Sequence, residues 1–259
     1  MKYIYVTITA TPCFTGRFIR TITNSNYNHV SLCFEPTLKE LYSFARRYKS
    51  TPFCGGFVKE SANRYKQKGR VAKLLLHKIP VTDEEYDNII LRIEDFLYNN
   101  EEYVYNNLAA VMSLLHLKIQ VKNSYTCVEF VAEQLKDLSA LKRRLTKKFY
   151  SIDSLREALS PFLVYSGRFP IEDGDWGDDR FNQKLSVKDI ISEELSDGRK
   201  LATNLVVTVY PEMRDMVKSA GESVSNSAKN GYRQVKKQYR NVKNSYFPKK
   251  GGNLHGKNT

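Results

Sequence analysis

The sequence predicts an α+β fold in which an antiparallel sheet packs on helices, and three observations lead to this prediction. Strand-like segments dominate the chain before Thr82, whereas helical periodicity dominates from there to Leu138. The two kinds of element are segregated and do not alternate as βαβ units would. Hydrophobic residues make up 41% and charged residues 27% of the 259 residues, which is ordinary globular usage. The chain can therefore bury a core.

The strands are expected in the following order. Lys2 to Thr9 alternates and is rich in Tyr, Ile, Val and Thr. His29 to Phe34 has strand composition and follows the Asn-rich turn NSNYN, and Leu41 to Arg46 would complete a hairpin-like pair. The Gly pair in PFCGGFVKE indicates a bulge or a close approach of the backbone. Arg70 to Ile79 is typical of a buried strand.

Helices follow. Thr82 and Glu85 form a capping box ahead of an apolar face. That face consists of Tyr86, Ile89, Ile90, Ile93, Phe96 and Leu97. A second helix is expected over Tyr105 to His116, and a third near Cys127, where apolar residues recur at helical spacing after the polar KNSYT. The segment from Pro161 to Gly167 is again strand-like.

The chain is expected to divide into a main domain at residues 1–170, an acidic connecting segment at 171–200 and a basic helical tail at 201–259. The acidic patch IEDGDWGDDRFN lacks the ligand spacing of a calcium loop, so a solvated surface loop is expected. The formal net charge is +13, and the residues from Leu201 onward hold eleven basic and three acidic side chains, or +8 of that total. The charge therefore describes the partners of the tail more than those of the main domain.

The tail carries Val, Ala and Tyr at helical spacing from Val224 to Tyr246, surrounded by Lys and Arg. A basic helix over residues 224–247 would suit an anionic membrane surface, nucleic acid or an acidic protein. The stripe lacks the Trp, Phe and Leu that drive deep membrane insertion. A packing helix, or a basic face that is only solvated, remains the alternative, and the Gly-rich residues beyond Phe247 are expected to be disordered.

Cysteine usage and hydropathy predict the cellular setting. The four cysteines include no CxxC pair, which argues against a disulfide framework or a thiolate zinc site. No run of apolar residues is long enough for a membrane-spanning helix, and the first residues do not form a signal peptide. We therefore expect a cytoplasmic protein with reduced thiols, no cofactor and no metal. Delivery by a phage particle or virion is a further option.

Two side chains could carry covalent chemistry. Cys127 follows NSYT at the first turn of a predicted helix, where free amide groups and the helix dipole favour a thiolate and could stabilise an oxyanion. A buried cysteine that only fills the core is the alternative. His29 opens a strand after a polar loop and is the best placed of the four histidines to act as a base. Cys13 and Cys54 lie in loop-like contexts and are expected to be structural, while Cys33 shares the strand parity of His29.

Four segments carry a resemblance. NHVSLCFEPTLKELYSFARR, PFCGGFVKES, YVYNNLAAV and YTCVEFVAEQL together resemble the circularly permuted NlpC-like (papain-fold, YiiX-like) cysteine peptidase and amidase family. In this branch the catalytic His precedes the Cys, so the resemblance implies a papain-like permuted NlpC fold over about residues 1–170. It also implies that His29 and Cys127 are the catalytic pair.

A third, orienting residue is expected on the strand after the His strand of such folds, and this position offers Ser43. Because many relatives have a stronger polar group there, Ser43 is a departure from the family pattern, and Glu60 competes with it for the role. Glu60 could equally be a surface carboxylate. Tyr125, two residues before Cys127, could line a substrate-binding site or simply pack among aromatic residues.

The resemblance implies a cysteine-dependent hydrolase that acts on a peptide or amide through a thioester. An acyltransferase or lipid acyl hydrolase of the same permuted fold is the first alternative. A non-catalytic scaffold whose basic tail binds nucleic acid, membrane or an acidic protein is the second.

Overall fold

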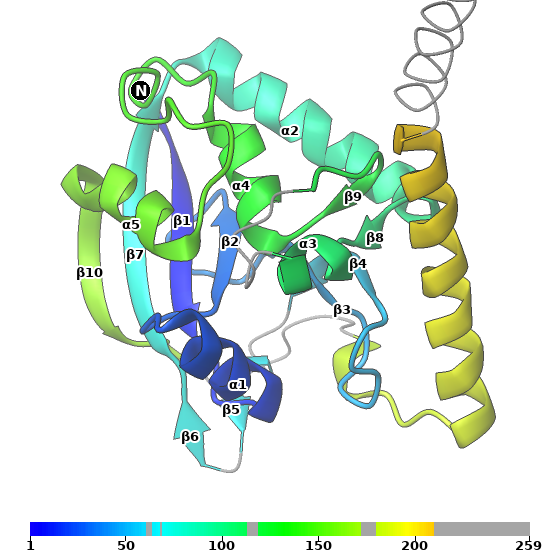
Figure 1. The fold of residues 1–259 in the computed structure, drawn as a ribbon. Helices are drawn as coiled ribbons and strands as arrows, with labels where there is room; N and C mark the ends of the chain where they lie inside the picture. The colour runs from blue at the N-terminus through cyan, green and yellow to red at the C-terminus, as the bar shows by residue number, and fades with distance from the viewer. Residues whose placement is uncertain (61–63, 68, 113–118, 172–179, 210–259) are drawn as a thin grey trace, which may run out of the picture. The chain divides into compact units, whose positions relative to one another are not determined.

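The protein is described from a computed structural model that covers residues 1–60, 64–67, 69–112, 119–171 and 180–209 (Figure 1). The chain divides into two compact units, Met1–Val207 and Thr208–Thr259. The predicted tail helix at 224–247 and most of the acidic patch lie outside the described residues.

A six-stranded antiparallel sheet forms the centre of the first unit (Figure 1). Its strands are, in spatial order, β10 (Leu163–Arg168), β7 (Lys73–Val81), β1 (Lys2–Ala10), β2 (His29–Cys33), β3 (Leu41–Arg46) and β4 (Gly55–Glu60). Two pairs of short strands lie outside it. They are the antiparallel pair β5 (Lys66–Gln67) and β6 (Arg70–Val71), and the parallel pair β8 (Val104–Tyr105) and β9 (Ser124–Tyr125).

The helices are α1 (Phe14–Thr23), α2 (Asp83–Tyr98), α3 (Asn107–Met112), α4 (Cys127–Leu135), α5 (Ile152–Leu159) and a helix over residues 187–209. Short 3₁₀ turns occupy Asn100–Glu102, Ser160–Phe162 and Arg180–Asn182. Among the described residues, no helix has the length and apolar character needed to cross a membrane.

The main core lies between the sheet and helices α2, α4 and α5. Ile4, Val6 and Ile8 of β1 are fully buried in it, because alternate residues of a strand point to the same face. Ile93 of α2 and Phe130 of α4 belong to the same cluster. The order of strands and helices and this segregated packing confirm the predicted α+β class.

A second apolar cluster contains Tyr5 of β1, which has the opposite parity. Tyr65 and Phe169 belong to it and stack with ring centroids 4.1 Å apart and planes 4° from parallel. The amide of Phe169 donates to the carbonyl of Ala72, and the amide of Ala72 donates to the carbonyl of Tyr65. Tyr65 is therefore held by its ring and by its backbone.

Most of the predicted strands and helices are present. The strands that begin at Lys2, His29 and Leu41 are confirmed, as is the capping box of Thr82 and Glu85 at the start of α2. The strand expected over Arg70–Ile79 is instead the short β6 followed by β7, with Ala72 between them.

The sequence did not predict helix α1, and the helix predicted to begin at Tyr105 begins later, as α3. Helix α1 is capped by Cys13, whose sulfur accepts from the amide of Gly16, and cysteine is not a usual capping residue. The second helix begins at Asn107 because β8 includes Tyr105, and residues 113–118 lie outside the described range.

The Gly pair of β4 marks a close approach of the backbone. The register from β3 to β4 is continuous, so there is no bulge between these two strands. A Cβ atom on Gly55 would lie 2.8 Å from the carbonyl oxygen of Ala45 and 2.9 Å from Cβ of Tyr105. Only glycine allows β8 to lie this close to β4.

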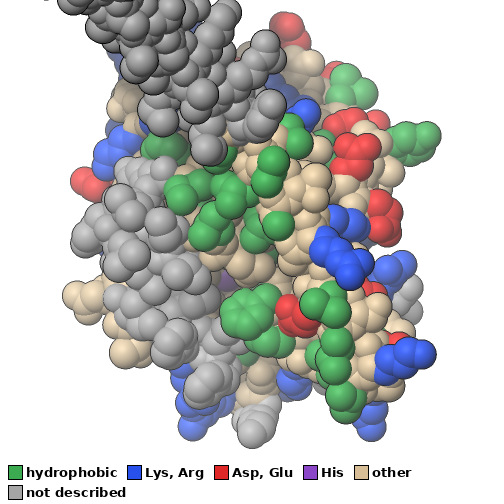
Figure 2. All heavy atoms as spheres, turned by 45° about the vertical axis from the view of Figure 1, so that its right-hand side comes forward, with side chains coloured by type: hydrophobic (Ala, Val, Ile, Leu, Met, Phe, Trp, Pro, Cys, Tyr) green, Lys and Arg blue, Asp and Glu red, His purple; other side chains and the backbone are tan. Residues whose placement is uncertain are grey.

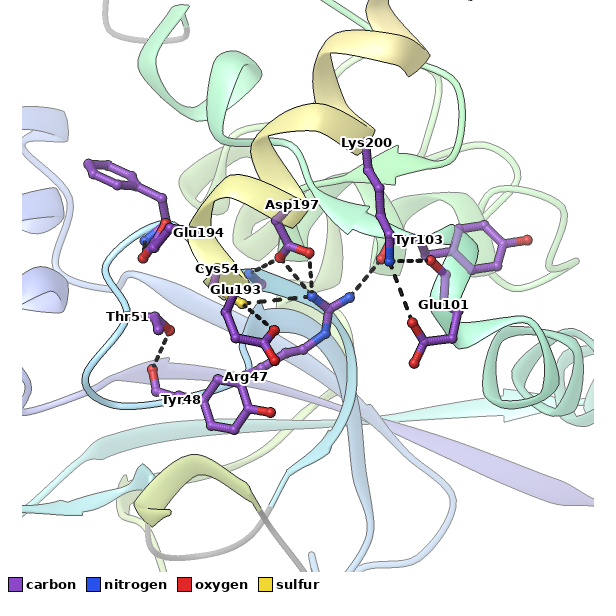
Figure 3. Close-up of polar contacts among 12 residues, drawn as sticks. Arg47, Tyr48, Thr51, Cys54, Glu101, Tyr103, Glu193, Glu194, Asp197 and Lys200 are labelled. Carbon is purple, nitrogen blue, oxygen red and sulfur yellow. Dashed lines mark hydrogen bonds and ion pairs between the residues drawn. The ribbon is translucent and has the colours of Figure 1, made fainter. Parts of the chain in front are cut away.

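A buried ion pair, between Arg47 and Asp197, holds the helix over residues 187–209 against the region of β4 and β8 (Figure 3). Nη1 of Arg47 lies 2.8 and 2.6 Å from the two carboxylate oxygens of Asp197, and Nη2 donates to the carbonyl of Tyr103 at 2.9 Å. Asp197 also accepts from the amide of Gly55 at 2.9 Å. Lys200 donates to the carbonyl of Glu101 at 2.8 Å. These contacts tie the helix to β3, β4 and the turn before β8.

The same helix also exposes apolar side chains. Figure 2, turned so that this helix comes forward, shows hydrophobic side chains grouped on the surface. The exposed apolar residues of the helix are Val187, Ile191, Leu195, Val206 and Val207.

Candidate active site

His29 and Glu60 meet inside the protein although they lie on different strands. His29 is the first residue of β2 and Glu60 the last of β4, with β3 between them. Nε2 of His29 lies 2.9 Å from Oε1 and 3.0 Å from Oε2 of Glu60. The two residues are only 9% and 2% exposed, so the contact is largely shielded from water.

The pKa values of this pair are shifted in opposite directions. Burial by itself lowers the pKa of His29, but the charge of Glu60 and hydrogen bonding to Cys127 and Glu60 outweigh it and raise the pKa to about 10. Burial likewise raises the pKa of Glu60, but the charge and hydrogen bond of His29, with the charge of Arg64, lower it to about 2. At neutral pH the pair is therefore an imidazolium and a carboxylate.

Cys127 is the first residue of α4, and its side chain is near enough to His29 to help raise the pKa of the imidazole. Thr126 caps the helix by accepting from the amide of Glu129 at 3.2 Å, while Glu129 accepts from the amide of Thr126 at 2.7 Å. This capping box fixes where the helix begins and places Cys127 in its first turn. Because Nε2 of His29 faces Glu60, a contact between the imidazole and the thiol would have to use Nδ1.

Comparisons with protein-family models, curated proteins and solved structures found no match. The geometry of the described residues therefore carries the chemical interpretation by itself.

The two candidates for the third residue both lie beside His29. Glu60 makes the shorter contacts, and Oγ of Ser43 lies 3.4 Å from the same nitrogen. Glu60 is buried, so it is not a surface carboxylate. The charge and the bidentate contact make Glu60 the stronger partner of the imidazole.

Tyr105 belongs to the candidate active site but was not predicted from the sequence. Burial and the charges of Cys127 and Glu129 raise its pKa well above the ordinary value, which places its phenol beside Cys127. Its position depends on the parallel pairing of β8 with β9, in which Tyr105 lies opposite Tyr125. No local pattern signals such a pairing of two-residue strands.

Tyr125 lies in an aromatic cluster. Its ring centroid is 5.1 Å from that of Phe44 and 5.8 Å from that of Phe96. These contacts describe packing, and a role in substrate binding stays a prediction.

Cys13, which was expected to be structural, is the N-cap residue of α1. Its sulfur accepts from the amide of Gly16 at 3.2 Å and lies 3.4 Å from Oγ1 of Thr11. Burial raises the pKa of this thiol, but the hydrogen bonds of Thr11 and Gly16 and the charge of Arg46 outweigh burial and lower it. Cys13 is therefore a thiol with increased thiolate character.

The other two cysteines have the opposite character. Burial raises the pKa of Cys33 to about 11, and its thiol donates to the carbonyl of Glu35 at 2.8 Å. Burial and the charge of Asp197 raise the pKa of Cys54 to about 12. Both are poor nucleophiles at neutral pH.

The described residues contain no group of three or more His, Cys, Asp and Glu side chains that could hold a metal ion. His77 is buried in β7, where burial lowers its pKa to about 4 and its Nδ1 lies 3.3 Å from the carbonyl oxygen of Val6. It is a neutral histidine of the core.

Proposed function

We propose that the protein is a cysteine-dependent hydrolase of the peptidase or amidase type, with the permuted NlpC-like fold that its sequence resembles. Cys127 is the nucleophile, His29 the general acid and base, and Glu60 the residue that orients His29. The observation that carries the proposal is the contact of both Glu60 oxygens with Nε2 of His29, whose ring also interacts with a thiol at a helix N-terminus. Such an arrangement stabilises a thiolate and imidazolium pair.

The reaction follows from these positions. The thiolate of Cys127 attacks the acyl carbon, a C–S bond forms, and the carbonyl electrons move to oxygen. The backbone amide of Cys127, at the helix N-terminus, and the phenol of Tyr105, which interacts with Cys127, are the donors assigned to this oxyanion. The C–N bond then breaks, and the leaving amine takes the proton of the His29 imidazolium.

Water completes the cycle. It gives a proton to the neutral imidazole and attacks the thioester, after which the C–S bond breaks and the carboxylic product leaves. Glu60 stabilises the imidazolium in both halves of the cycle. Transfer to an acceptor other than water would make the same centre an acyltransferase, which remains the alternative.

An activated ester tests the proposal without knowledge of the natural substrate. Incubation with p-nitrophenyl acetate should release p-nitrophenol in a burst and add one acetyl group to Cys127, detected by mass spectrometry of peptides. Cys127→Ala should abolish the burst, whereas Cys13→Ser, the matched control, should retain it. Acetylation confined to Cys13, or a burst that survives Cys127→Ala, would overturn the proposal.

A further inference from the structure

The carboxylate of Glu60 has more hydrogen-bonding partners than His29 alone. Oγ of Ser31 donates to Oε1 at 2.7 Å, and the hydroxyl of Tyr65 donates to Oε2 at 2.9 Å. The two hydroxyls lie 3.2 Å from each other. Each oxygen of Glu60 is thus held by one of these two hydroxyls and also faces Nε2 of His29, and the side chain of Ser43 further lowers the pKa of this carboxyl.

These hydroxyls are buried as deeply as the carboxylate. Ser31 and Tyr65 are fully buried, and Glu60 is 2% exposed. Without water, an ionised carboxylate is stable only when donors or a positive charge replace its hydration. Ser31 and Tyr65 supply two such donors, and His29 supplies a donor and the charge.

The two hydroxyls come from elements that are themselves fixed. Ser31 lies in β2, two residues after His29, and pairs with Thr7 of β1. Tyr65 stacks on Phe169. Donors fixed in this way hold the carboxylate group in one orientation and also stabilise its negative charge.

From this geometry we propose that Ser31 and Tyr65 are positioning residues of the Cys127, His29 and Glu60 centre, which keep Glu60 ionised and aimed at His29. This inference rests on the proposed function. The charged or titratable groups that face Glu60 are His29 from β2, Tyr65 and Arg64. Each hydroxyl that is removed leaves the charge of Glu60 less stabilised, so the carboxyl should accept a proton at higher pH.

Tyr65→Phe and Ser31→Ala test this, alone and together. Each lost hydrogen bond should raise the pKa of Glu60 by about one unit. Histidine labelled for NMR provides a readout that needs no catalysis, because the ring signals of His29 respond when the carboxyl at Nε2 is protonated. In the wild-type protein these signals should stay constant as pH falls below the ordinary carboxyl value of 4.5 and should change only near the Glu60 pKa of about 2. In the double variant an inflection should appear at about pH 4, two units above the wild-type value.

A matched control is available in the same sheet. The hydroxyl of Tyr42 in β3 donates to Glu40 at 3.0 Å, so Tyr42→Phe removes the same kind of hydrogen bond away from Glu60. This variant should leave the titration of His29 unchanged. Because Tyr65→Phe keeps the ring that stacks on Phe169, it tests the inference by itself if Ser31→Ala does not fold.

The acid limb of the acylation rate gives the second readout. In Tyr65→Phe it should move to higher pH by about one unit, a tenfold change in proton affinity. If Tyr65 were only structural, Tyr65→Phe would lower the melting temperature but would not shift the acid limb of the pH profile of acylation. Folded variants whose His29 signals titrate as in the wild type would overturn the inference. If Cys127 is never acylated but the titration shifts, the proposed function fails and the positioning of Glu60 stands.

Discussion

Glu60 and His29 form a buried pair whose protonation is displaced in opposite directions, with pKa values of about 2 and about 10. Each residue therefore keeps its partner charged across the whole physiological range. The ion pair should therefore affect the stability of the fold, which can be measured without a substrate.

The free energy of unfolding that this pair contributes should decrease at both high and low pH. The raised pKa of His29 means that its contribution is complete below 6.5 and is lost as pH rises through about 10. The lowered pKa of Glu60 means that its contribution is complete above 4.5 and is lost as pH falls through about 2. Glu60→Gln should cost about 3 to 5 kcal/mol at pH 6, since it leaves a buried imidazole without its anion. Urea unfolding across pH measures this, and an unchanged midpoint for Glu60→Gln would contradict the ion pair.

His77 should act in the opposite direction to His29. Its folded pKa of about 4 lies below 6.5, so the unfolded chain binds more protons and stability falls as pH falls from 6.5 through 4. The loss should reach about 3 kcal/mol, and His77→Gln should flatten this part of the curve. Equal slopes for the variant and the wild type would show that His77 is protonated in the folded protein.

The thiols should differ in reactivity. In a Cys13→Ser background, in which serine can keep the cap of α1, iodoacetamide at neutral pH should label Cys127 before Cys33 and Cys54. Adding His29→Gln should slow the labelling of Cys127 about tenfold or more, because the thiolate loses its imidazolium. Peptide mass spectrometry over time gives the rates. Uniform labelling of the three thiols would argue against an activated Cys127.

The buried pair of Arg47 and Asp197 should matter more than an exposed pair. Arg47→Met should destabilise the protein by about 3 kcal/mol because it leaves a buried carboxylate without its cation, and Asp197→Leu in the same chain should restore most of the loss. The matched control is Lys59→Met, which removes the exposed pair with Glu40 and should cost less than about 1 kcal/mol. Thermal melts decide this, and equal costs for both single variants would refute it.

The basic tail gives a prediction that comes from the sequence alone, since residues 210–259 lie outside the described residues. Deleting residues 224–259 should leave the melt of the main unit unchanged and abolish binding to vesicles with anionic lipids. Binding of the full chain should weaken steeply as salt rises. Oligonucleotides in place of vesicles test the nucleic-acid alternative. A collapse of the melt would show that the tail stabilises the fold.

The sequence was informative where a feature is local. Alternation in β1, the capping box at Thr82 and the apolar face of α2 each occupy one short segment. The first two are confirmed, and the third is confirmed except for Leu97, which is exposed. Thr126 and Glu129 have the same capping spacing, which could have located the start of α4 more firmly. Helix α1 was missed because a cysteine takes the place of the usual cap.

The site depends on contacts that no local pattern encodes. Glu60 is chosen over Ser43 because the sheet brings the end of β4 close to the start of β2, which depends on strand order and side-chain length. Tyr105 depends on a parallel pairing across 20 residues, and Asp197 on a contact 150 positions away from Arg47. Such relationships are set by tertiary packing.

The hydrogen bond from the Gly55 amide to Asp197 has a consequence for the solution behaviour of the protein. Strand β4 is an edge of the sheet, and unpaired amides on an edge strand invite strands of other molecules to join it. Asp197 occupies the Gly55 amide, and Glu194 accepts from the amide of Phe53 just before the strand at 3.0 Å. The helix over residues 187–209 therefore covers these two amides, and a chain cut before residue 187 should self-associate through this edge.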